Sequence, residues 1–309
     1  MTPLTRRTAL FGACACCALA TRRTAAAATD FTEIAPGMFF RRGLDAEASA
    51  TNADAIANTG FIVGADSVAV IDPGGSLADG QALRAAIAAH TTRPVRFVVL
   101  SHVHPDHIFG AAAFTEGAPR IVGHTRLPAA LGTRGEYYRR HLAELLGAEA
   151  AGSVVTPNLL VTDTQTLDLG DRRLTVRAHR PAHTDTDLTL FDAQTSTLIT
   201  ADLLFIGRVP SFDGDLKGWL AELDSLAAIG AARVVPGHGP VTTDWPAAAA
   251  DLRRYLNLLL SETRAAIAAG VPIEQAATRV AATERGRWAL FDDYNPRNVL
   301  TAYHQLEWE

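Results

Sequence analysis

The chain has 309 residues, of which 48% are hydrophobic and 20% charged, the profile of a soluble globular protein large enough to bury a core. Its formal net charge is −5, and beyond residues 1–28, which hold four arginines and no acid, 24 basic residues stand against 33 acidic ones. A surface of that sign repels phosphate backbones and anionic lipid heads, and no basic run carries interleaved aromatic residues. We therefore expect no nucleic-acid partner.

Residues 1–28 are expected to be an export signal. Residues 5–11 resemble a twin-arginine motif, residues 9–20 are apolar, and residues 25–28 are small enough for cleavage. The apolar stretch falls short of the roughly 20 residues that span a bilayer, so no membrane insertion of the mature form is expected. The predicted location is the periplasm. A disordered basic tail and lipidation at Cys14 are the alternatives.

The cysteines restrict the chemistry of any metal site. All three lie inside the expected signal, at Cys14, Cys16 and Cys17. The mature protein would hold no thiolate, so a metal site there must use histidine and carboxylate.

Residues 29–309 contain no repeat or low-complexity linker and are interpreted as one domain, with a helical extension from about residue 246. Apolar runs and turn residues predict strands at 39–43, 60–64, 67–72, 96–100, 120–122, 167–169, 173–179, 188–191, 198–200 and 233–235. Helical spacing and caps predict helices at 77–90, 136–146, 216–229, 246–269 and 297–307. This mixture indicates two sheets packed face to face with helices outside.

The segment 101–107 reads Ser-His-Val-His-Pro-Asp-His and follows an apolar strand. Alternation places His102 and His104 on one side of an extended segment, and a tight turn at Pro105 can return Asp106 and His107 to the same opening. A lone histidine is more often structural than a ligand. Four residues of the types that zinc accepts, within six positions, instead predict a metal site.

Three more candidates each follow a predicted apolar strand, namely His183, Asp202 and His238. Taken singly, the histidines could be ordinary loop residues, and Asp202 a turn former or helix cap. Taken with the first loop, they complete a set of seven candidate ligands.

The pattern His102-X-His104-X-Asp106-His107, followed by the three later candidates, resembles the metallo-β-lactamase superfamily over about residues 31–245. The resemblance implies an α/β fold, a four-layer αββα sandwich of two mixed sheets with outer helices. It also implies one metal on His102, His104 and His183. It implies a second metal on Asp106, His107 and His238, with Asp202 as the bridge.

The same resemblance gives a role to Asp72, which follows an early predicted strand and matches the aspartate that orients a ligand imidazole in this superfamily. A turn residue before Pro73 is the alternative. Asp202 is a departure from true β-lactamases, which generally lack a bridging carboxylate, and resembles glyoxalase II. Segments 51–58, 101–110 and 288–295 further resemble the SoxH-like branch of quinoprotein relay system zinc metallohydrolases, which implies a periplasmic quinoprotein system as partner.

The predicted function is a dinuclear zinc hydrolase with two Zn²⁺ per chain. A metal-bound hydroxide, held by Asp106 as the catalytic residue, would attack a (thio)ester, lactone or amide of a small molecule. One alternative is a mononuclear iron persulfide dioxygenase on the same fold, because histidine and carboxylate suit iron as well as zinc. Another is a non-catalytic metal-binding relay protein. The sequence leaves the substrate and the oligomeric state open.

Other polar residues carry weaker expectations. Residues 137–140, Tyr-Tyr-Arg-Arg, are interpreted as a solvated helix face, with a substrate rim as the alternative. Residues 291–295 are expected in a loop that lines the cleft or packs a dimer. Lys217 is expected in solvent and His179 at a strand end beside the ligands. Surface positions are expected for His124, His141 and His304.

Overall fold

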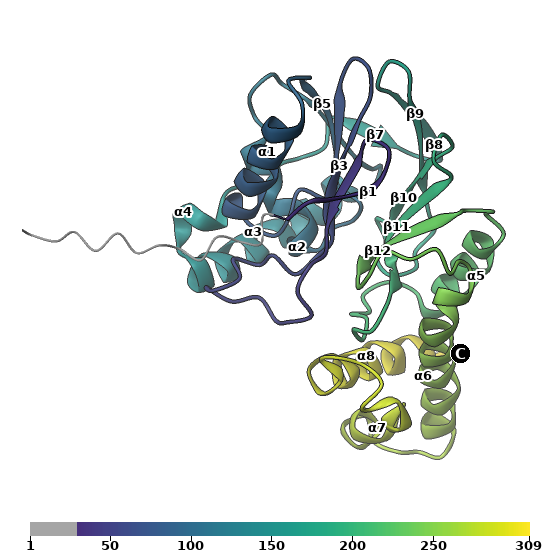
Figure 1. The fold of residues 1–309 in the computed structure, drawn as a ribbon. Helices are drawn as coiled ribbons and strands as arrows, with labels where there is room; N and C mark the ends of the chain where they lie inside the picture. The colour runs from purple at the N-terminus through teal and green to yellow at the C-terminus, as the bar shows by residue number, and fades with distance from the viewer. Residues whose placement is uncertain (1–29) are drawn as a thin grey trace, which may run out of the picture.

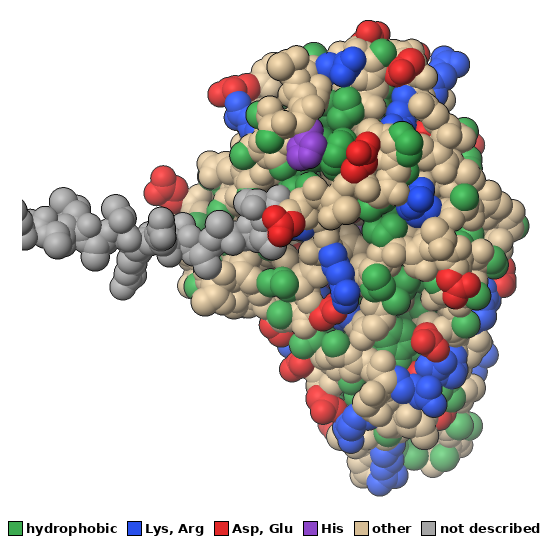
Figure 2. Space-filling model, viewed as in Figure 1, with side chains coloured by type: hydrophobic (Ala, Val, Ile, Leu, Met, Phe, Trp, Pro, Cys, Tyr) green, Lys and Arg blue, Asp and Glu red, His purple; other side chains and the backbone are tan. Residues whose placement is uncertain are grey.

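The computed structural model describes residues 30–309 (Figure 1). The predicted export signal and the three cysteines lie outside the described residues. Within residues 30–309, no helix combines the length and the apolar character that a membrane span requires. On the face drawn in Figure 2, acidic and basic side chains are interspersed.

The first sheet has seven strands in chain order. Neighbours from β1 to β4 run antiparallel, and neighbours from β4 to β7 run parallel. The strands are β1 (Thr32–Ala35), β2 (Met38–Arg41), β3 (Thr59–Val63), β4 (Val68–Ile71), β5 (Val95–Val99), β6 (Arg120–His124) and β7 (Leu159–Val161).

The second sheet has five strands in the order β12-β11-β10-β9-β8. Only the β11–β12 pair is parallel; the others are antiparallel. The strands are β8 (Thr164–Asp168), β9 (Arg173–Ala178), β10 (Leu188–Asp192), β11 (Thr197–Phe205) and β12 (Arg233–His238).

Helices lie outside the two sheets, with α1 and α3 on the side of the first and α5 and α6 on the side of the second (Figure 1). The helices are α1 (Leu77–His90), α2 (Pro105–Ile108), α3 (Leu127–Leu146), α4 (Ala148–Ala151), α5 (Leu216–Ala227), α6 (Ala250–Ala268), α7 (Ile273–Arg279) and α8 (Phe291–Leu306). Short 3₁₀ turns cover Phe109–Ala113, Ala247–Ala249 and Ala282–Glu284. The predicted αββα arrangement of two mixed sheets is confirmed.

Three buried apolar clusters fill the three interfaces between the four layers. One joins the first sheet to its helices through Leu83 and Val98, and one lies between the sheets around Ile62 and Leu190. The third joins the second sheet to α5, α6 and α8 around Trp219. Burial of these faces against one another is the main force that holds the layers together.

The best-predicted elements have strong local signals. The side chain of Ser76 accepts a hydrogen bond from the backbone N–H of Asp79 and caps α1, whose Leu83 and Ile87 are buried at helical spacing. All four residues of β4 are buried, as expected for an apolar strand within a sheet covered on both faces.

Two helices begin earlier than predicted. Helix α3 starts at Leu127 rather than 136. The sequence does not signal this start, because the N-cap residue Arg126 makes no side-chain cap bond and because Gly132 and Gly135 interrupt the helical pattern. Helix α8 starts at Phe291 rather than 297 and includes Pro296, which suggests a break when only the sequence is considered. Residues 291–295 are therefore helical and not the predicted loop. Strands β1 and β7 and helix α7 had not been predicted.

Candidate metal centre

The first four candidate ligands lie directly beyond β5. This strand is buried from Phe97 onward and delivers His102 to the interior, 1% exposed. His104 is the N-cap of α2 and Pro105 occupies its first turn, where a missing N–H costs nothing. Asp106 and His107 therefore lie in a helical turn rather than in the predicted tight turn.

Two of the other three candidates lie closer to their strands than predicted. His183 occupies a loop after β9, whereas Asp202 is inside β11 and His238 is the last residue of β12. Ala201 has a φ of 46° and the β11–β12 register shifts around it, so the strand is bent immediately before Asp202. At Gly237, an added Cβ would lie 1.8 Å from Asp202 Oδ1, so only glycine lets β12 approach this carboxylate.

The structure brings all seven candidates together in two groups. Within each group, one potential ligand atom per residue lies within 4.8 Å of the others. The first group is His102, His104, His183 and Asp202. The second group is Asp106, His107 and His238. This is the division that the family resemblance implied.

The Asp202 carboxylate reaches both groups. Its Oδ1 lies 3.1 Å from Nε2 of His107, which belongs to the second group. Its Oδ2 lies 3.3, 3.5 and 3.6 Å from the Nε2 atoms of His183, His238 and His102. Asp106 Oδ2 is 3.2 Å from His238 Nε2 and 3.5 Å from His107 Nε2.

These distances fit a metal better than hydrogen bonds. Within the described residues, His102 Nε2, His107 Nε2 and Asp202 Oδ1 are buried and have no hydrogen-bond partner. Two ligand atoms about 2.0–2.2 Å from one tetrahedral ion lie about 3.3–3.6 Å apart, which is close to the spacing observed. A compact set of buried, unpartnered nitrogen and carboxylate atoms is costly unless an ion satisfies it. The donor set therefore suits a metal.

Hydrogen bonds on the far side of the rings hold the ligands in place. His107 Nδ1 donates to Asp72 Oδ2 at 2.8 Å, and Ser101 donates to both oxygens of Asp72, at 2.8 Å each. His238 Nδ1 donates to the backbone carbonyl of Ile56 at 2.9 Å. With Nδ1 protonated, each ring directs the lone pair of Nε2 into the cluster. Asp72 thus lies where the resemblance placed it.

Burial and charge set the protonation of the cluster. Burial lowers the pKa of His102 well below its ordinary value and that of His183 to about 3, so both rings are neutral at pH 7. Burial alone would raise the pKa of Asp202, but His107 and His238 outweigh it and hold that pKa well below the usual range. Burial opposes the change, but Asp202 and other nearby carboxylates raise the pKa of both His107 and His238. Because metal binds neutral imidazole and ionised carboxylate, these two rings would release their extra protons when a metal binds.

The cluster opens into a cleft with a volume of about 450 Å³. His104, Asp106, Asp202 and His238 line its floor, and Tyr137 and Tyr138 of α3 line one side. Tyr137 and Arg140 are exposed, as expected of a solvated helix face, and both tyrosines also line the cleft, as in the alternative interpretation. Arg139 and Arg140 do not line the cleft. Tyr294 also lines the cleft, as one of the two expectations for residues 291–295 had it, and so do Asp54, Arg208 and Arg297, which the sequence did not single out.

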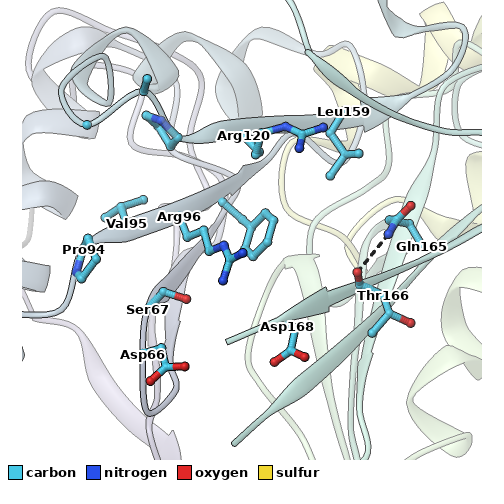
Figure 3. A pocket seen from close by; sticks show the side chains of 14 residues that line it. Asp66, Ser67, Pro94, Val95, Arg96, Arg120, Leu159, Gln165, Thr166 and Asp168 are labelled. Atoms are coloured by element: carbon cyan, nitrogen blue, oxygen red, sulfur yellow. Dashed lines mark hydrogen bonds between the residues drawn. The ribbon is translucent and has the colours of Figure 1, made fainter. Parts of the chain in front are cut away.

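A larger cavity, about 710 Å³, lies away from these residues and is drawn in Figure 3. It is lined by residues at the beginnings of parallel strands, such as Val95 and Arg120, and by Thr166 of β8. The candidate ligands lie at the opposite ends of those strands. None of the seven candidate ligands lines the larger cavity, so the larger of the two cavities is not the candidate metal site.

The remaining candidates of the sequence analysis fall into two classes. His304 and Lys217 are exposed, pairing with Glu307 and Glu309. His179 is buried at a strand end between Glu222 and Thr189, at 2.8 Å from each. His141 is exposed at the edge of the cleft.

The prediction that His124 lies at the surface is wrong, because its side chain is only 3% exposed. Its Nδ1 accepts the backbone N–H of Arg126 at 3.0 Å. Burial and the charge of Arg126 lower its pKa from 6.5 to about 4. The sequence offered no partner motif for this residue, and its position at the end of β6 is what buries it.

This placement predicts a pH effect. In the unfolded chain His124 is protonated below about pH 6.5, whereas in the folded protein it stays neutral down to about pH 4. The free energy of unfolding therefore decreases as the pH is lowered from 6.5 to 4. In His124→Asn, whose amide oxygen can still accept the Arg126 N–H, we expect a shallower fall and an unchanged metal content. Urea unfolding of the metal-free proteins at pH 7 and pH 5 measures this, and parallel pH dependences would contradict it.

Comparison with known proteins assigns the family. The model of the metallo-beta-lactamase superfamily matches residues 53–238, which include all seven candidates. The chain belongs to the metallo-beta-lactamase superfamily. Membership and the clustered ligands together make it a metal-dependent hydrolase of this superfamily.

One relative in sequence and two solved structures illustrate the similarity. The acyl-coenzyme A thioesterase MBLAC2 of Bos taurus is 30% identical over 149 residues, or 44% of this chain and 48% of the relative, so the chain matches about half of that protein's length. A sec-alkylsulfatase from Pseudomonas sp. matches with a TM-score of 0.68 and 18% identity over 88% of this chain and 49% of its own. A metallo-beta-lactamase family protein from Thermus thermophilus matches with a TM-score of 0.64 and 21% identity, over 89% of this chain and 94% of its own.

Proposed function

We propose that the chain is a dinuclear zinc hydrolase that cleaves a thioester or a related carbonyl compound of small size. The observation that carries the proposal is the carboxylate of Asp202, placed 3.1–3.6 Å from histidine nitrogens of both groups. A single ion would leave one group unsatisfied, since each group alone supplies at least three ligand atoms. The thioesterase named among the relatives supports the choice of substrate class.

The residues of the chain have separable roles. His102, His104 and His183 would hold one zinc, the second group the other, and Asp202 would bridge them. When bound, the ions supply Lewis acidity that polarises a carbonyl and lowers the pKa of water to about 7. Asp106 lines the cleft, so its carboxylate can accept a hydrogen bond from the attacking water and orient it.

The test is metal quantification of the purified protein together with a substrate panel. We expect two zinc ions per chain and hydrolysis of an acetyl thioester, a lactone or an amide. Chelation should abolish this activity and two equivalents of zinc should restore it. One iron per chain with oxygen uptake on glutathione persulfide would instead show a dioxygenase. Full occupancy without turnover of any compound would show a non-catalytic binding protein.

The cellular setting is a further part of this proposal. The twin-arginine pattern of residues 5–11 supports export to the periplasm, and segments 51–58 and 288–295 support the SoxH-like branch with a quinoprotein system as partner. Fractionation of the producing cells tests the location, and recovery of the protein only from the cytoplasm would contradict it.

A further inference from the structure

Arg208 is a buried cation beside the metal groups. It follows β11 in the loop that leads away from Asp202, and it is 4% exposed. The loop is fixed to the segment before α8, because Val209 N donates to Ala289 O at 3.1 Å and Ala289 N donates to Gly207 O at 2.8 Å. The guanidinium is therefore held at the cleft, which it lines.

Arg208 has no carboxylate at ion-pair distance among the described residues, although Glu47 and Asp54 also line the cleft. Across residues 30–309 its Nε is also buried without a partner. Its Nη2 donates to the hydroxyl of Tyr294 at 3.2 Å. Its Nη1 lies 3.1 Å from His238 Nδ1, which already donates to Ile56 and so cannot accept a proton from Arg208. A buried guanidinium with unused donors is costly unless an anion satisfies it.

A second arginine lies on the same side of the cleft. The guanidinium carbons of Arg208 and Arg297 are 5.3 and 5.5 Å from the centre of the Tyr294 ring. Arg297 is exposed, lines the cleft and, within the described part of the chain, also has no ion pair. Each of these two guanidiniums offers a fork of N–H donors, which is the arrangement that an anionic oxygen group binds.

Part of the cleft wall is apolar. Tyr138, Leu142 and Leu145 of α3 line it, together with Phe212 from the loop before α5. The cleft thus offers two guanidinium groups and an apolar wall beside the candidate ligands, and Glu47, Asp54 and Asp213 also line it. Such a cavity selects a molecule with an anionic end and an apolar body.

We propose that the substrate is an acyl compound whose acyl chain ends in a carboxylate, and that Arg208 and Arg297 bind this carboxylate. The inference rests on the proposed hydrolysis of a carbonyl compound. One imidazole separates Arg208 from the metal groups, so the carboxylate lies a few bonds from the carbonyl that is cleaved. The leaving group lies toward the apolar wall of α3.

The experiment uses two thioesters of one thiol, glutaryl and pentanoyl N-acetylcysteamine, which differ in a terminal carboxylate. With the zinc-loaded protein, we expect kcat/KM to favour glutaryl by about 10-fold or more, the effect of hydrogen bonds to a charged group. Arg297→Gln should lower that ratio about 10-fold, mainly through KM. The matched control, Arg279→Gln on the exposed side of α7, should leave the ratio unchanged. Arg208→Gln is compared at equal metal content, because Arg208 contacts His238.

The outcomes separate this inference from the proposed function. No preference for glutaryl, or a preference that survives in Arg297→Gln, would overturn the carboxylate site while leaving hydrolysis intact. If neither thioester is cleaved, thioester hydrolysis is ruled out as the proposed function, and calorimetric titration of the protein with glutarate then tests the carboxylate site separately. Binding of glutarate that weakens about 10-fold in Arg297→Gln supports the site. Equal glutarate binding in the parent protein and in Arg297→Gln overturns the carboxylate site. If inorganic phosphate binds and glutarate does not, the site recognises a phosphate group and the proposed carboxylate is wrong.

Discussion

Asp202→Asn is expected to lose at least about 1,000-fold in kcat/KM and to retain fewer than two metal ions per chain. Among the carboxylates of residues 30–309, only Asp202 lies within 3.6 Å of histidine nitrogens in both ligand groups. An amide has the same shape but no charge, so it cannot balance two divalent cations in a buried site. Metal analysis and kinetics of the variant, prepared with excess zinc, measure both effects.

The control for this variant is Asp224→Asn on α5. Asp224 is exposed, pairs with Arg253 and lies outside the cleft, so metal content and activity should equal those of the parent protein. If Asp202→Asn kept two ions and full activity, the bridging assignment would be wrong and the two groups would act separately.

The second large effect is expected from Asp72→Asn, which should lower activity or metal affinity about 10–100-fold. The carboxylate accepts the Nδ1 proton of His107 at 2.8 Å and so keeps the lone pair of Nε2 toward the metal. An asparagine can turn its NH₂ toward His107 Nδ1, which favours the other tautomer and places the ring proton on Nε2. Loss of the metal held by Asp106, His107 and His238 is the signature to measure.

Asparagine is chosen because Asp72 has a φ of 47°, a conformation that asparagine tolerates better than alanine does. A folding defect is therefore not expected, and thermal unfolding of the metal-free variant should match the parent. Ser101→Ala removes one hydrogen bond to Asp72 and also the 2.9 Å hydrogen bond between Ser101 Oγ and His102 Nδ1, so its effect should extend to the metal held by His102. Unchanged metal affinity in Asp72→Asn would mean that packing alone orients His107.

Several elements of the fold were predictable because their signals are local. The cap at Ser76 and the four apolar residues of β4 specify α1 and its neighbouring strand without help from the rest of the chain. The start of α3 was not predictable, because Gly132 and Gly135 weaken its helical pattern and packing of Leu127 and Leu131 against the first sheet compensates.

For the site, the sequence alone determined the seven candidate ligands, since histidine and aspartate at strand ends are chemically distinctive wherever the chain places them. Only the tertiary structure decided how Asp202 reaches both groups, through the bend at Ala201 and the close approach of Gly237. Only it placed Arg208, Tyr294 and Arg297 together, although they are up to 89 positions apart in the numbering. Charge and burial around a side chain depend on its neighbours in space, and a residue's identity does not encode those neighbours.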